Sequence, residues 1–406
     1  MADFYQNGVV TTLHNLSKRS HESLEQDLLK FTKQRPLGLI LPSLFSELEG
    51  EALPAIVDEL TTVPYLNQIV IGLDRADQAQ YQHALKFFNK LPQHHRILWN
   101  DGPRLKALDA KLEKLGLAPK ELGKGRNVWY CMGYILATDK AESVALHDCD
   151  IVTYEKSLLA RLIYPVAHPQ FNYEFSKGFY ARIADGKING RVSRLLVTPL
   201  IKALKRTVGC NEYLDYMDSF RYPLAGEFSF RRDVLSDLRI PSDWGLEIGV
   251  LSEMQRNYAH NRICQVDIAD IYDHKHQDLS LDNQNAGLSK MSIDITKAFF
   301  RKLATQGQTF STETFRSIKA TYFRIALDYV EAYRHDALMN GLTLDVHNEE
   351  KAIEMFAKNI VAAGQMFLDR PMETPFMPTW NRVQSAVPDI LEELKDAVEQ
   401  DHMEFS

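Results

Sequence analysis

The sequence has few cysteines, no long apolar run and no excess of basic residues, and each absence removes a class of protein. The four cysteines are widely spaced and form no CxxC pair, which is typical of reduced thiols in a cytoplasmic protein. No apolar segment approaches the roughly 20 residues that span a bilayer, and residues 1–19 have no apolar stretch typical of a secretory signal. A net charge of -7 argues against nucleic acid as the main partner.

Strand and helix patterns alternate along the first part of the chain. Short apolar runs over residues 37–43, 67–74 and 95–99 predict buried strands. Amphipathic runs over residues 47–60 and 77–91 predict helices between them. Strands that alternate with helices favour a mostly parallel sheet covered on both faces, so the predicted fold class is α/β.

Acidic side chains follow the ends of the predicted strands. Asp148 and Asp150 come directly after the apolar run 143–147, and Asp74 ends the run 67–74. Ligands of parallel sheets bind at the carboxyl ends of the strands, and paired carboxylates suit Mg²⁺ or Mn²⁺ with substrate phosphates. The alternative is a turn in which the two aspartates only accept hydrogen bonds from backbone amides.

Two glycine-containing basic segments are candidate anion sites. Lys124 lies between Gly123 and Gly125 before a predicted helix, an arrangement that lets an ammonium approach a diphosphate. Arg191 and Ser193 end a basic loop before another predicted helix, where they could hold an anionic substrate group. A surface turn and a solvated loop are the respective structural alternatives.

Further polar candidates follow later in the chain. Glu247 lies in the first turn of a predicted helix, where it either caps the helix or faces a ligand next to Gly245 and Gly249. His274 and His276 follow a predicted strand over residues 266–271. They are either structural side chains or a source of a third metal ligand.

The two ends of the chain predict mainly helix. Residues 1–35 suggest an N-terminal helical arm, and residues 285–406 suggest helices over 292–305, 313–340, 348–367 and 383–398. We find no functional motif in this C-terminal region, which is expected to pack on the α/β domain or to build a dimer interface. Its acidic end, residues 392–404, is expected to be solvated.

Several segments, in order, resemble one family, the retaining GT-A glycosyltransferases of the glucosyl-3-phosphoglycerate synthase type. The resembling segments span residues 37–280 and are LPSL (41–44) with Glu47, GKG (123–125), DCD (148–150), GRVS (190–193), PLAGE (223–227), GLEIG (245–249) and the region of His274. The resemblance implies a GT-A fold, which is Rossmann-like with a mostly parallel sheet flanked by helices, over residues 36–284. It divides this domain into a nucleotide-sugar half (36–152) and an acceptor half (153–284), followed by the helical C-terminal extension.

The resemblance also implies a role for each matching residue. The donor-binding positions are Pro42, Ser43, Leu44, Glu47, Asp74, Lys124, Asp148 and Cys149. The acceptor-binding positions are Gly190, Arg191, Ser193 and His276, the metal ligands are Asp150 and His274, and the catalytic positions are Glu247 and Asp148. The chain departs from the family pattern at Phe45-Ser46, Ser193, Tyr272 and His276, where the family has Asn-Glu, Thr, Arg and Asn.

The implied activity is metal-dependent transfer of glucose from a nucleotide sugar, UDP-glucose, to 3-phosphoglycerate, with Mg²⁺ or Mn²⁺ as cofactor. The product would feed synthesis of glucosylglycerate, a compatible solute. Alternatives are a mannosyl- or glucosyltransferase that acts on glycerate or another small acid, a nucleotidyltransferase, and an inactive sugar-nucleotide-binding module. We expect a cytoplasmic homodimer that binds neither nucleic acid nor membrane.

Overall fold

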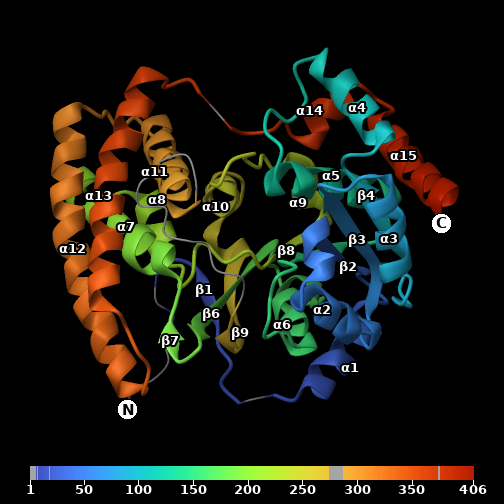
Figure 1. Ribbon diagram of the computed structural model, residues 1–406, viewed down its shortest axis with the longest axis horizontal. Coiled ribbons are helices and arrows are strands. Elements are labelled where there is room, and N and C mark those ends of the chain that lie inside the picture. Colours follow the sequence, from blue (N-terminus) through green and yellow to red (C-terminus); the bar gives the residue numbers. More distant parts are fainter. Residues whose placement is uncertain (1–5, 7, 18, 274–286, 374) are drawn as a thin grey trace.

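A nine-stranded sheet forms the centre of the computed structural model, which describes residues 6, 8–17, 19–273, 287–373 and 375–406 (Figure 1). The strand order is β1-β9-β6-β8-β5-β2-β3-β4, and β7 pairs with β6. The strands are β1 (Thr11–Leu13), β2 (Leu37–Leu44), β3 (Leu66–Asp74), β4 (His95–Trp99), β5 (Ser143–Leu146), β6 (Phe175–Ala184), β7 (Lys187–Ile188), β8 (Phe228–Arg231) and β9 (Ile263–Tyr272).

All strands of that path run in one direction except β8, which is antiparallel to both β5 and β6. The predicted mostly parallel sheet is therefore confirmed. Because β2 lies between β5 and β3 in parallel register, their carboxyl ends meet at one edge of the sheet.

Helices cover both faces of the sheet, as the α/β pattern predicted. The helices before the C-terminal region are α1 (His21–Phe31), η1 (Phe45–Glu49), α2 (Ala52–Thr61), α3 (Gln78–Phe88), α4 (Pro103–Glu113), α5 (Lys124–Thr138), α6 (Lys156–Ala167), η2 (Val192–Val197), α7 (Thr198–Val208), α8 (Glu212–Asp218), α9 (Arg232–Asp237), α10 (Leu246–Asn257) and η3 (His260–Arg262). Alternate residues of β2 enter two separate cores, with Leu39 and Leu41 on one face and Ile40 on the other. Burial on both faces explains why this strand reads as a continuous apolar run.

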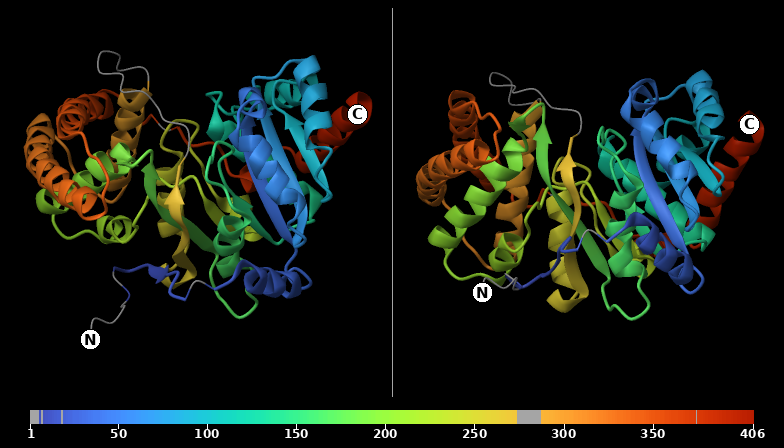
Figure 2. Two further views of the ribbon diagram at one scale, coloured as in Figure 1. Left: turned by 60° about the horizontal axis from the view of Figure 1, so that its bottom comes forward. Right: turned by 90° about the horizontal axis from the view of Figure 1, so that it is seen from below.

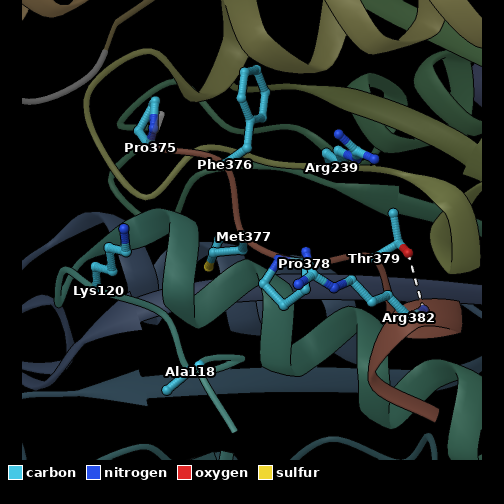
Figure 3. Close-up of a pocket in the computed structure, with 10 residues that line it drawn as sticks. Ala118, Lys120, Arg239, Pro375, Phe376, Met377, Pro378, Thr379 and Arg382 are labelled. Carbon is cyan, nitrogen blue, oxygen red and sulfur yellow. Dashed lines mark hydrogen bonds between the residues drawn. The ribbon is translucent and has the colours of Figure 1, made fainter. Parts of the chain in front are cut away.

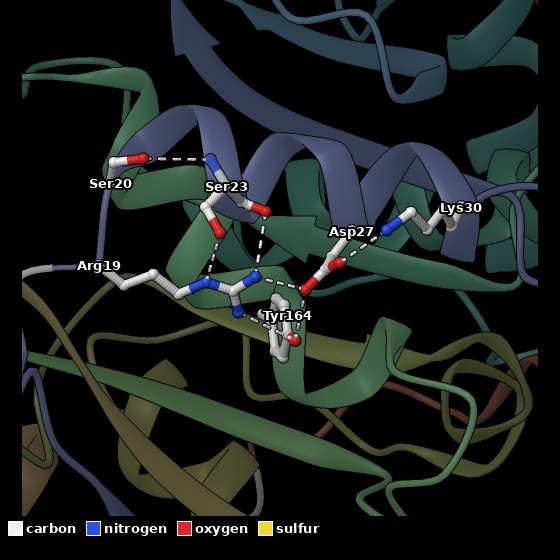
Figure 4. A network of polar contacts seen from close by, with 6 residues as sticks. All are labelled: Arg19, Ser20, Ser23, Asp27, Lys30 and Tyr164. Atoms are coloured by element: carbon white, nitrogen blue, oxygen red, sulfur yellow. Dashed lines mark hydrogen bonds and ion pairs between the residues drawn. The ribbon is translucent and has the colours of Figure 1, made fainter.

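In the described part of the N-terminal arm, the expected helix begins at His21. Residues 11–13 instead form β1, which extends the sheet by pairing with β9. The arm is fixed to α6 by a polar network in which Arg19 pairs with Asp27 at 2.5 Å and lies 3.3 Å from the hydroxyl of Tyr164 (Figure 4). Three residues are too few for a recognisable strand pattern, so β1 could not be predicted from the sequence.

The C-terminal region divides between two sides of the molecule (Figures 1 and 2). Its helices are α11 (Gly287–Thr305), α12 (Thr312–Met339), α13 (Val346–Asp369), α14 (Trp380–Ala386) and α15 (Ile390–Phe405). Helices α11–α13 pack together beside α7, whereas α15 packs on α4, α5 and β4 at the opposite side. The region therefore packs on the α/β domain, which is one of the two arrangements expected for it.

Two expectations for the C-terminal region are wrong. The single helix expected over residues 383–398 is two helices, α14 and α15, because Pro388 cannot continue the first. The acidic end is not a solvated tail: Glu393 lies 2.6 Å from Lys111, and Glu399 lies 2.9 Å from Arg96. Asp401 is fully buried. These ion pairs attach α15 to the half of the sheet that carries β4.

No helix in the described part of the chain has the length and apolar character that crossing a membrane requires.

Candidate active site

A cavity of about 650 Å³ lies at the carboxyl ends of β2, β3 and β5. Leu44 and Asp74 are partners in register where β2 and β3 end, and Asp148 follows β5 after one residue. The cavity brings together most of the residues singled out in the sequence, namely Pro42, Ser43, Leu44, Glu47, Asp74, Lys124, Asp148, Cys149, Asp150, Gly190, Arg191, Ser193 and Glu247. Segments more than 100 residues apart in the chain thus share one space.

Lys124 connects two acids across this cavity. It is the first residue of α5, and its Nζ lies 2.6 Å from Asp148 Oδ1 and 3.2 Å from Glu247 Oε1. Burial opposes the charged ammonium, but the carboxylates of Asp148 and Glu247 outweigh this effect and raise the pKa of Lys124. The side chain therefore supplies a permanent positive charge beside the aspartate pair.

The contacts around Lys124 depend on close backbone approach. A Cβ on Gly125 would lie 2.2 Å from the carbonyl oxygen of Pro241, so only glycine lets α5 begin against the segment before α10. That approach places Lys124 next to Glu247, the second residue of α10. Glu247 was predicted in the first turn of a helix, and this placement is confirmed.

The aspartate pair has the chemistry of a divalent-cation site. Burial and the neighbouring charge of Asp148 raise the pKa of Asp150 to about 7, because two carboxylates this close repel each other. A divalent cation would remove that repulsion, and carboxylate oxygens are suitable ligands for Mg²⁺ or Mn²⁺. The described residues contain no group of three or more His, Cys, Asp or Glu arranged to hold a metal. His274 and His276 lie outside the described residues.

The backbone just before β8 contacts the carboxylate of Asp148. A Cβ on Gly226 would lie 2.4 Å from Asp148 Oδ2, so the backbone at Gly226 supports this carboxylate directly. The next residue, Glu227, is fully buried and accepts hydrogen bonds from the hydroxyls of Tyr180 at 2.7 Å and Tyr272 at 2.6 Å. Burial, and then the charge of Asp148, raise the pKa of Glu227.

A buried lysine lies near the carboxylates of Glu227 and Glu247. Lys177 on β6 is 1% exposed and donates a hydrogen bond to the carbonyl oxygen of Ala225. Burial lowers the pKa of Lys177 to about 8, although Glu247 and Glu227 act in the opposite direction. Neither Lys177 nor Glu227 was among the predicted site residues. A buried strand lysine gives no spacing signal, whereas Glu227 ends the PLAGE motif and could have been included on that ground.

The basic loop before η2 also lines the cavity. Gly190 has a φ of +77°, which favours glycine, and its carbonyl oxygen accepts a hydrogen bond from the backbone N–H of Arg194 at 3.0 Å. Arg191 and Ser193 both line the cavity. Arg191 Nε donates to Glu349 Oε1 at 2.7 Å, a contact that reaches into the C-terminal region.

Several cavity residues were not identified from the sequence. Those from strands, loops and α5 include Arg75, Asn127, Tyr180, Arg182, Asn189, Tyr222, Asp243 and Trp244. Those from α11 are Leu288, Lys290, Met291 and Ile295. We found no motif in the C-terminal region, and none was available, because α11 shows only the apolar periodicity of a packed helix.

A second, smaller cavity of about 280 Å³ lies beside the segment that joins α13 to α14 (Figure 3). Lys120, Arg239 and Arg382 line it together with residues 375–379. None of the site residues predicted from the sequence lines this cavity. Its segment is fixed by the Ser242 N–H, which donates to Pro375 O at 3.0 Å, and by the Met377 N–H, which donates to Ile240 O at 2.9 Å.

Comparison with known proteins gives full-length relatives. No family model matches the chain. The glucosyl-3-phosphoglycerate synthase of Persephonella marina is 47% identical over 402 residues, covering 99% of each chain. The glucosyl-3-phosphoglycerate synthase of Methanococcoides burtonii is 39% identical over 407 residues, also covering 99% of each chain.

Solved structures share the fold. Glucosyl-3-phosphoglycerate synthase from Mycobacterium tuberculosis, in complex with Mn²⁺, UDP-glucose and phosphoglyceric acid, is 19% identical with a TM-score of 0.52. The match covers 72% of this chain and 87% of that chain. A structure of the same enzyme with Mg²⁺ and UDP is 20% identical with a TM-score of 0.51, covering 72% of this chain and 86% of that one. The predicted GT-A-type fold is thereby confirmed.

Gly226→Ala tests the support under Asp148. The added Cβ would force the carboxylate away, so we expect the affinity for Mn²⁺ to fall roughly 10-fold or more while the protein still folds. Isothermal titration calorimetry measures the affinity. Gly50→Ala is the control, because its Cβ would lie 3.4 Å from the nearest atom. Unchanged Mn²⁺ binding in Gly226→Ala would show that this contact does not set the metal site.

Proposed function

The chain belongs to the glucosyl-3-phosphoglycerate synthase family, and we propose that it moves glucose from UDP-glucose to 3-phosphoglycerate with retention at the anomeric carbon. The observation that carries this proposal is the full-length likeness to two synthases of that name, which confirms the family predicted from the motifs and makes the protein a glycosyltransferase. The related enzyme from M. tuberculosis binds UDP-glucose and phosphoglyceric acid with Mn²⁺.

The donor is proposed to occupy the part of the cavity formed by β2, β3 and β5. Pro42, Ser43, Leu44 and Glu47 would hold the uracil and ribose, together with Asp74. The amide of Asn100 donates to Asp74 Oδ1 at 2.8 Å and fixes that carboxylate at the strand end. The diphosphate would then lie near Lys124 and the segment from Asp148 through Cys149 to Asp150.

The leaving UDP needs compensation for the charge that develops on its diphosphate. Lys124 provides one fixed cation, because its two carboxylate partners keep it protonated. A Mg²⁺ or Mn²⁺ ion, when bound, supplies Lewis-acid stabilisation of the same charge. We propose Asp150 as a direct ligand of that ion and His274 as a second. Asp148 would support the donor.

Glu247 is proposed to orient the transferred glucose. Its Oε1 already lies 3.2 Å from Lys124 Nζ, so the carboxylate is fixed at the boundary between the proposed diphosphate and sugar positions. A carboxylate oxygen accepts hydrogen bonds from sugar hydroxyls. In a retaining reaction of this type the departing phosphate takes the proton of the acceptor hydroxyl, so the protein need not supply a general base.

The acceptor is proposed to bind at the loop that carries Gly190, Arg191 and Ser193, and His276, outside the described residues, keeps its proposed acceptor-binding role. The acceptor 3-phosphoglycerate carries a phosphate and a carboxylate, and a guanidinium recognises either group with paired hydrogen bonds. These assignments give residues 36–152 the donor and residues 153–284 the acceptor. Helix α11 of the C-terminal region also lines the cavity.

The assembly and compartment are also proposed here. All four cysteines are free thiols and three are buried, which supports a reducing cytoplasm.

We propose a homodimer, in keeping with the family resemblance. Light scattering during size-exclusion chromatography gives the mass in solution, and a monomeric mass would contradict the dimer.

Turnover decides the proposed reaction. With UDP-glucose, Mg²⁺ and 3-phosphoglycerate we expect UDP release that depends on the acceptor. GDP-mannose as donor and glycerate as acceptor are the comparison reactions. If turnover with either exceeds that with the proposed pair, the substrate assignment is wrong. Absence of UDP release with any three-carbon acid would reject the transferase activity.

Asp150→Asn tests the metal ligand. The substitution keeps the size of the side chain and removes its charge, so we expect turnover to fall on the order of 100-fold or more. Mn²⁺ affinity, measured separately by calorimetry, should fall as well. Asp328→Asn on the exposed surface of α12 is the matched control. Wild-type turnover by Asp150→Asn without added metal would show that this residue is not a ligand.

Arg191→Ala tests the acceptor loop. Charge-assisted hydrogen bonds to an anion would be lost, so we expect the KM for 3-phosphoglycerate to rise roughly 10- to 100-fold. The KM for UDP-glucose should change less than about 3-fold. Arg206→Ala, at an exposed position on α7, is the control for losing an arginine. Equal rises in both KM values would reject the assignment of Arg191 to the acceptor.

A further inference from the structure

A buried carboxylate of the C-terminal region pairs with the proposed acceptor loop. Glu349 lies in the first turn of α13 and is 1% exposed. Its Oε1 accepts a hydrogen bond from Arg191 Nε at 2.7 Å, and its Oε2 lies 2.9 Å from Arg194 Nη2. One acid from α13 thus pairs with two arginines at the start of η2, which are more than 150 residues away in the sequence.

The two arginines have different surroundings. Arg194 is 7% exposed, donates to the carbonyl oxygen of Asn189 at 2.7 Å and lies 4.7 Å from the ring centre of Tyr333 on α12. Its guanidinium is therefore enclosed by protein. The side chain of Arg191 is 34% exposed and lines the main cavity. Of this pair, only Arg191 is open to a ligand in that cavity.

The geometry of the Arg191 contact leaves donors for a ligand. Glu349 takes the Nε hydrogen, while a guanidinium carries two further nitrogens with four more hydrogens. An arginine held at Nε keeps its terminal nitrogens for an anion and loses the rotational freedom of its long side chain. One carboxylate against two guanidinium groups also leaves a single net positive charge, and Arg191 is the member that reaches the cavity.

We propose that Glu349 is a positioning residue for the acceptor, holding Arg191 so that its terminal nitrogens face the anionic group of the three-carbon acid. The proposal rests on the acceptor role given to Arg191 above. The proposal gives α13 a function, because this helix would fix the proposed acceptor loop, which carries Gly190, Arg191 and Ser193 and precedes α13 in the chain.

Two effects oppose each other when Glu349 loses its charge. Neutralisation adds one positive charge near the acceptor, which favours anion binding. It also weakens the contact that holds Arg191, because a neutral oxygen accepts the Nε hydrogen bond less strongly than a carboxylate, and it leaves Arg191 and Arg194 with no carboxylate between them. The cavity is open to water, which screens the added charge, so the loss of position dominates. Acceptor binding should therefore weaken.

Glu349→Gln is the test, because it keeps the shape of the side chain and removes the charge. We expect the KM for 3-phosphoglycerate to rise roughly 10-fold, with kcat and the KM for UDP-glucose changed less than about 2-fold. The double variant Arg191→Ala/Glu349→Gln should match Arg191→Ala alone within about 2-fold, because Glu349 acts through Arg191. Additive effects in the double variant would overturn the proposal.

Tyr322→Phe is the matched control. The hydroxyl of Tyr322 on α12 donates to the carbonyl oxygen of Leu195 in η2 at 2.6 Å, so it joins the same C-terminal helices to the same segment without contacting a guanidinium. This variant should lower the melting temperature and leave the acceptor KM unchanged. If it gives the same split between the two KM values as Glu349→Gln, the role of Glu349 is structural only. An unchanged or lowered acceptor KM in Glu349→Gln also overturns the proposal.

Failure of the proposed function has a different signature. If the wild-type enzyme uses another acidic acceptor better than 3-phosphoglycerate, the substrate assignment fails, and the comparison of KM values with that acceptor still tests Glu349. If the wild-type enzyme shows no turnover, titration calorimetry with 3-phosphoglycerate, UDP and Mg²⁺ compares the same variants by affinity. Equal affinities of wild type and Glu349→Gln would then reject the positioning role.

Discussion

The site depends on one electrostatic constraint, which is that several carboxylates must share a small space at the end of a parallel sheet. Asp148, Asp150 and Glu247 all line the cavity, and Glu227 is buried beside Asp148. Lys124 makes this arrangement possible by pairing with two of them. Because Asp148 follows β5 and Glu247 begins α10, the ion pairs of Lys124 also join the proposed donor half to the acceptor half.

Unbalanced negative charge at this point is consistent with the proposed chemistry. Burial, and then the charge of Asp148, raise the pKa values of Asp150 and Glu227. A divalent cation would offset this negative charge, and the oxygens of a diphosphate would complete its coordination shell. Under the proposed function, metal binding would therefore relieve the repulsion between Asp148 and Asp150, next to the backbone of Gly226.

The C-terminal region attaches to the α/β domain at two separate places. Helix α15 pairs with α4 and β4 through Glu393 and Glu399, and α13 pairs with the loop before η2 through Glu349. In each case acids of the C-terminal helices meet basic side chains of the α/β domain. Some of the acids that suggested a solvated end instead form ion pairs where these helices pack on the α/β domain. A charge pattern alone does not distinguish a solvated acid from a paired one.

The sequence by itself determined the strand ends, the glycine positions and the motif order. These were enough to predict the α/β fold, the family and a set of site residues, most of which line one cavity. These are local features, because a strand period, a glycine and a short motif are read within a few residues. Only the tertiary structure decided which distant side chains meet. Lys177 and Glu349 come next to the site, and α11 comes to line it, through packing between segments far apart in the chain, and such packing leaves no pattern within any one segment.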